Sequence, residues 1–156
     1  MNSGNVAETM QLFIQTRGGY ISDGPFSYEK IHEVREMLEV RVASVAAERA
    51  TEVDLVELRA AFQALVEAAD SPELSSARDV EFHRMIAKIT HNELYMIMLD
   101  SIGPLLLKIR EETLGKRARR QDALPFHKRI LDAIEQGDSK KAALAMSCLL
   151  YTSRCV

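Results

Sequence analysis

Helical periodicity runs along almost the whole chain and constrains its fold more than any other feature. Apolar residues recur three and four positions apart, and no stretch alternates apolar and polar residues as a strand would. Ser, Thr, Asp and Asn stand where helices would start, and Gly or Pro stands where they would end. The pattern predicts an all-α fold, an antiparallel bundle of six to seven helices. The expected helices span residues 5–17, 27–50, 51–69, 76–90, 92–114, 122–136 and 139 onward.

The size and charge of the chain exclude several classes of protein. Its 156 residues suit a single domain. The net charge of −3 argues against direct DNA binding by this segment, because phosphate contacts need an excess of basic residues. No apolar run reaches the roughly 20 residues that cross a bilayer, and residues 1–4 lack the basic start of a secretory signal. Both cysteines lie within the last nine residues, and we expect a cytoplasmic protein.

Four ionisable side chains lie on helix faces that should point inward. Asp79 and His83, four residues apart, project as neighbours along one edge of an apolar face. His127 lies in the middle of a second apolar stripe, and Arg35 lies within a third. Buried charges are costly unless they are paired or coordinated. One arrangement satisfies all four: Asp79, His83 and His127 bind a divalent metal, and Arg35 faces an anion at its open positions.

Plainer interpretations of the same residues remain open. An Asp–His pair at this spacing is usually a structural hydrogen bond, and His127 fits a neutral core histidine that donates to a carbonyl. Arg35 has Glu39 and Asp79 as alternative partners. A di-iron bundle is disfavoured, because it needs two Glu-x-x-His motifs and the chain has one, at Glu29 and His32. No phosphate-binding loop or nucleophile elbow is found.

The order of several motifs is similar to that of a known domain family. Residues 33–35, 38–39 and 46–51 resemble the start of the FadR C-terminal (FCD) domain of GntR-family bacterial transcriptional regulators. Residues 79–83 resemble its Asp-x-x-Phe-His motif, and Asn92 its downstream Asn. Residues 127–133, with Gly137-Asp138 and Ala142, resemble its third conserved segment.

This resemblance implies a helical, usually dimeric domain that binds a small carboxylate effector through a metal held by one Asp and three His. The Asp corresponds to Asp79, and two of the His correspond to His83 and His127, with Arg35 as a partner for the effector's carboxylate. The resemblance implies a regulatory domain, and we expect no catalytic activity. Zn, Ni and Mn remain open as the metal. A metal-dependent helical-bundle enzyme and a plain dimerisation bundle are the alternatives.

The chain departs from the family pattern at both ends. We expect residues 1–18 to be the connecting helix that follows a winged helix-turn-helix missing from this chain, so DNA would be bound only through that absent domain. Residues 19–147 would be the effector-binding and dimerisation domain. The family's last His corresponds to Leu149, which leaves three protein ligands. Residues 148–156 resemble a translated sequencing adapter rather than a helix, and we expect a non-native tail there.

Overall fold

The computed structural model describes residues 27–113 and 117–154, and all of their regular structure is helical. The predicted helix over residues 5–17 and the connecting segment 1–18 lie outside these ranges. None of the described helices is long and apolar enough to cross a membrane. The elements are α2 (Tyr28–Arg49), α3 (Glu52–Glu67), the short 3-10 helix η1 (Ala68–Asp70), α4 (Pro72–Ile89), α5 (Glu93–Thr113), α6 (Arg117–Glu135) and α7 (Ser139–Arg154).

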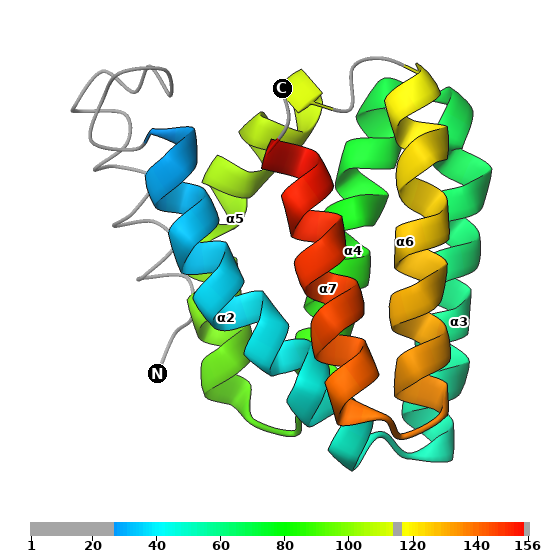
Figure 1. Ribbon diagram of the computed structural model, residues 1–156. Helices are drawn as coiled ribbons and strands as arrows, with labels where there is room; N and C mark the ends of the chain where they lie inside the picture. Colours follow the sequence, from blue (N-terminus) through cyan, green and yellow to red (C-terminus); the bar gives the residue numbers. More distant parts are fainter. Residues whose placement is uncertain (1–26, 114–116, 155–156) are drawn as a thin grey trace.

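The helices form two layers of three (Figure 1). One layer holds α2, α7 and α6, with α7 packed between the other two. The second layer holds α5, α4 and α3, with α4 in the middle. Contacts of α2 with α4 and of α3 with α6 join the layers. The all-α prediction is therefore confirmed.

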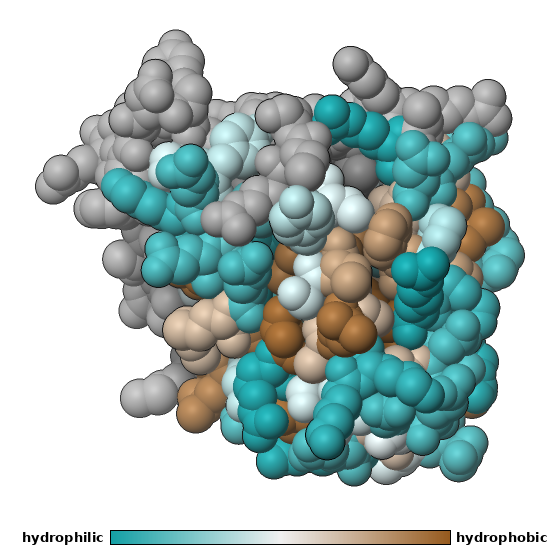
Figure 2. Space-filling model, in the orientation of Figure 1, coloured by the Kyte–Doolittle hydropathy of each residue, from teal (hydrophilic) through white to brown (hydrophobic). Residues whose placement is uncertain are grey.

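The core lies between the layers and consists of large apolar side chains from every helix. Phe82 of α4 and Ile130 of α6 are completely buried, and burial of such side chains contributes about 1.5–3 kcal/mol each. On the face shown in Figure 2, hydrophilic side chains dominate and a hydrophobic patch lies near the centre. The largest completely or almost completely buried apolar side chains are Leu58, Phe82, Ile86, Ile89, Leu106, Ile130, Ile134, Met146 and Leu150.

Local signals at the helix ends explain most of the boundaries. Thr51 and Asp54 form the predicted capping box at the start of α3, each accepting a hydrogen bond from the other's backbone N–H. Gly137 has a φ of +66°, the left-handed conformation that ends α6 and turns the chain into α7.

Two predicted helix starts are too late. The structure begins α4 at Pro72 because Ser71 caps the helix, its hydroxyl accepting the Leu74 N–H, and Pro is favoured in a first turn. It begins α6 at Arg117, five residues before the predicted start at residue 122, within a run of basic residues made of Lys116, Arg117, Arg119 and Arg120. Arg120 of that run is buried and donates from Nε to the Ala69 carbonyl oxygen at 2.7 Å, which fastens the start of α6 to η1.

The segment expected to be a non-helical tail continues α7 instead. Residues 148–154 are helical, and Leu149 and Leu150 are buried in the core. Leu149 and Leu150 suit the inner face of a helix, which the resemblance to an adapter does not take into account. The non-native origin of residues 148–156 stays a prediction.

Candidate metal centre

Asp79 and His83 of α4 and His127 of α6 meet in the interior of the bundle. The three residues are 5%, 3% and 2% exposed. One ligand atom from each lies within 4.8 Å of the other two, so all three can reach one ion. The spacing of Asp79 and His83 is set by a single turn of α4, whereas His127 is brought in by the packing of α6.

The carboxylate of Asp79 lies between the two imidazoles. Its Oδ1 atom is 2.6 Å from Nε2 of His127, and its Oδ2 atom is 3.9 Å from Nε2 of His83. The two rings are nearly perpendicular, at 89°, with centroids 5.7 Å apart. Each histidine therefore turns the same nitrogen, Nε2, toward one shared carboxylate.

The outer nitrogen of each imidazole faces an oxygen that can only accept a hydrogen bond. Nδ1 of His127 is 2.9 Å from the Ala123 carbonyl oxygen, and Nδ1 of His83 is 2.6 Å from Oε1 of Glu39. His127 thus has an acceptor at both nitrogens, although a neutral imidazole carries only one N–H. A further positive charge is needed between His127 and Asp79, either a proton or a metal ion. The donor set, two nitrogens and a carboxylate, fits a divalent transition metal.

The ring of Phe82 packs against the imidazoles of both histidines. Its ring is completely buried and makes edge-to-face contacts with His83 and His127, at centroid distances of 6.0 and 5.3 Å. Such contacts fix ring orientation as well as excluding water. The imidazoles are therefore held by packing in addition to their polar contacts.

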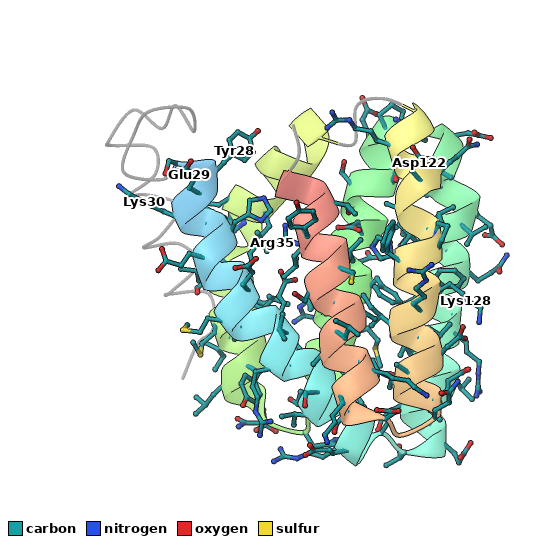
Figure 3. All side chains as sticks on the ribbon, in the orientation of Figure 1. Tyr28, Glu29, Lys30, Arg35, Asp122 and Lys128 are labelled. Carbon is teal, nitrogen blue, oxygen red and sulfur yellow. The ribbon has the colours of Figure 1, made fainter. Side chains whose placement is uncertain are left out.

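Arg35 of α2 is buried beside this cluster and is paired with Glu39. Its Nε atom donates to Oε2 of Glu39 at 2.6 Å, one of the two pairings that the sequence left open. Figure 3 places Arg35 between α2 and α7. Glu39 therefore contacts both Arg35 and His83, one with each carboxylate oxygen.

Comparison with known proteins identifies the family. Residues 30–152 match the sequence model of the FCD domain. The chain belongs to the FCD domain family. The resemblance noted in the sequence is thus confirmed.

The curated relatives of this FCD domain are transcriptional regulators. It is 32% identical over 123 residues to the HTH-type transcriptional regulator LutR of Bacillus subtilis, covering 76% of this chain and 56% of that protein. It is 30% identical over 122 residues to the galactonate operon transcriptional repressor of Escherichia coli, covering 78% and 53%. The chain thus spans about half the length of these relatives.

Solved structures agree with this family. A GntR protein of Streptococcus agalactiae aligns with a TM-score of 0.70 at 27% identity, over 81% of this chain and 58% of that one. The E. coli protein McbR/YncC aligns with a TM-score of 0.69 at 17% identity, over 93% and 79%, which supports the fold.

Sequence reasoning missed two polar residues of the FCD domain's interior. Glu39 was considered only as a partner of Arg35, yet it also reaches His83 from α2. His32 is 2% exposed, although only its place in a Glu-x-x-His motif had been considered. The signal was present, since positions 32, 35 and 39 fall on one face of a helix. At the position of the family's last histidine, Leu149 is buried in α7.

His91, the fourth histidine, lies outside the metal centre. It follows α4 with a φ of +51°, and its side chain is half exposed. Its Nε2 atom is 2.9 Å from Oδ2 of Asp54. Burial raises the pKa of Asp54, but hydrogen bonds from the Thr51 backbone, the Thr51 hydroxyl and His91 outweigh burial, and the net pKa is below the usual value.

Proposed function

We propose that this FCD domain is the sensing domain of a GntR/FadR-type transcriptional regulator and binds a small carboxylate effector through a divalent metal. Asp79, His83 and His127 would hold the metal, with Zn, Ni and Mn all compatible with the donors. Arg35 would contact the effector's carboxylate. The matched relatives are regulators, and this assignment carries their class of function to the chain.

The orientation of the two imidazoles is the main observation that supports the proposed metal site. Both Nε2 atoms face Asp79, while both Nδ1 atoms face acceptors at 2.6 and 2.9 Å. Metal-binding histidines show this arrangement, with the nitrogen remote from the ion donating to a carboxylate or carbonyl. A bound cation would also compensate the carboxylates buried here.

A carboxylate effector agrees with both the chemistry of the site and the relatives. Three protein ligands leave coordination positions that an oxygen anion can take when a metal is bound. A buried guanidinium is the side chain best suited to hold the same anion through two hydrogen bonds. One relative is the galactonate operon repressor and another is a putative L-lactate dehydrogenase operon regulator, and both galactonate and lactate are carboxylates.

The remaining partners follow from the proposed role. We infer that the domain pairs with a second copy of itself in the cytoplasm. DNA would be bound by a winged helix-turn-helix that the described residues do not include. Size-exclusion chromatography with light scattering tests the pairing, and a monomeric mass at micromolar concentration would contradict it.

Thermal unfolding with and without metal tests the metal site. Metal at a hundredfold excess over its Kd stabilises the folded form by about 2.7 kcal/mol. The unfolding temperature of the chelator-treated protein should then rise by about 5–10 °C on addition of zinc or nickel. His127→Gln should abolish the shift, whereas the control His91→Gln should keep it. No shift in the unaltered protein would refute the site.

A thermal-shift screen of small organic acids tests the effector class. Carboxylic acids should stabilise the zinc-loaded protein more than the matching alcohols or amides do. Arg35→Lys keeps a positive charge beside Glu39 but lacks the planar fork, so it should reduce this stabilisation. Equal responses to acids and amides would rule out carboxylate recognition.

A further inference from the structure

Glu39 holds the imidazole of His83 from the side opposite Asp79. Oε1 of Glu39 lies 2.6 Å from Nδ1 of His83, and Glu39 is only 1% exposed. The contact joins α2 to α4, so the orientation of a proposed metal ligand depends on a helix that supplies no ligand. Oε2 of the same carboxylate accepts the hydrogen bond from Arg35 at 2.6 Å.

This contact selects one tautomer of His83. An ionised carboxylate accepts hydrogen bonds and donates none, so the neutral imidazole must carry its proton on Nδ1. Nε2 then presents its lone pair toward the space shared with Asp79 and His127. Without Glu39, the more natural arrangement is a proton on Nε2 that points toward Asp79, because a carboxylate oxygen is 3.9 Å away.

His127 offers an internal comparison. Its Nδ1 atom faces the backbone carbonyl oxygen of Ala123, an acceptor that belongs to the same helix, α6. His83 has instead a charged side chain on another helix, and this acceptor can be changed by substitution. A carboxylate acceptor also makes an imidazole a more basic ligand than a neutral carbonyl does.

We propose that Glu39 is a positioning residue that fixes His83 in the tautomer with the proton on Nδ1, so that Nε2 is available to the metal. Arg35 keeps the Glu39 carboxylate in place and offsets its buried charge. The inference deepens the proposed function, since it rests on His83 being a metal ligand. Its first test, however, requires no metal.

The tautomer of His83 can be read directly from the metal-free protein. Nitrogen-15 NMR of histidine-labelled protein distinguishes a proton on Nδ1 from one on Nε2, and comparison with His83→Gln assigns the signal. The unaltered protein should show the proton on Nδ1. A proton on Nε2 would overturn the proposal.

Removal of the carboxylate together with its partner supplies the second test. The double variant Arg35→Met/Glu39→Leu replaces the buried ion pair with apolar side chains, a change that proteins often tolerate. The His83 proton should move toward Nε2, and the affinity for zinc, measured by competition with a chelator, should fall about 10–100-fold. The control Arg84→Met/Asp100→Leu removes an exposed ion pair from α4 and α5 and should leave both readouts unchanged.

Glu39→Gln keeps the proposal testable if the double variant does not fold. Because Arg35 only donates, the single amide oxygen should face Arg35 and the amide N–H should face Nδ1 of His83. The His83 proton should therefore move to Nε2, and the affinity for zinc should fall. A proton retained on Nδ1 in this variant, or unaltered zinc affinity in a folded double variant, would overturn the role of Glu39. If the unaltered protein bound no zinc but kept the proton on Nδ1, the proposed function alone would fail.

Discussion

Nε2 of His127 lies 2.6 Å from Oδ1 of Asp79, although 48 residues separate them in the chain. The pair joins α6 to α4 in the interior, where both side chains are almost fully buried. It brings the imidazole of α6 to the Asp-x-x-Phe-His turn of α4. The candidate site is therefore a property of the packed bundle rather than of one helix.

Asp79→Asn should abolish zinc binding while leaving the fold helical. The amide retains the shape of the carboxylate but lacks the negative charge that offsets a divalent cation. Isothermal titration of the chelator-treated protein with zinc checks this. The control Asp100→Asn alters an aspartate paired with Arg84 on the surface and should bind zinc normally. Unchanged binding by Asp79→Asn would remove Asp79 from the ligand set.

Leu149→His should tighten zinc binding. The substitution restores the family's fourth ligand. Zinc sites with four ligands reach roughly 10–16 kcal/mol of binding free energy, and each ligand contributes a part of it. The affinity for zinc should therefore rise about tenfold or more. The metal-free variant should be less stable, because a core leucine is lost. Chelator competition measures the affinity. Cys148→His, one position out of register, is the control, and equal affinities in the two variants would show that the register assigned to α7 is wrong.

Phe82→Ala should lower the free energy of unfolding by about 3–5 kcal/mol, the usual cost of truncating a fully buried aromatic ring. Because the ring also packs against both histidines, zinc affinity should fall in any molecules that remain folded. Urea denaturation measures the first effect. Leu144→Ala, at a position 66% exposed, should change stability by less than about 0.5 kcal/mol.

Asp54→Ala should destabilise the protein by about 0.5–2 kcal/mol through loss of the capping box of α3. The pKa of Asp54 is lowered in the folded state, so its stabilising contribution is fully present above the unfolded pKa of about 3.9. The contribution is lost as the pH falls through the lower, folded value. Urea titrations at pH 6 and pH 3 should therefore show a larger difference between variant and parent at pH 6, and an equal difference would contradict this.

Much of the fold and site could be predicted because the deciding signals are local. Asp79 and His83 share a turn, and the stripe around His127 identifies the inner face of α6 from neighbouring residues alone. Glu39 and Arg120 were harder, because each is explained by a contact with another helix or turn: Glu39 by His83, and Arg120 by the Ala69 carbonyl. From sequence alone, a charged residue is interpreted as solvent-exposed, because its partner on a distant segment is not known.

The last turn of α2 is hydrogen-bonded to the segment between α4 and α5. Nη1 of Arg49 donates to the Thr90 carbonyl oxygen at 2.8 Å, directly after α4. Glu39 lies about 15 Å up the helix from this attachment, and Tyr28 about 30 Å. This hydrogen bond therefore fixes the end of α2 relative to the end of α4. A tilt of α2 about Arg49 that moved Glu39 by about 1 Å would move Tyr28 by about twice that distance.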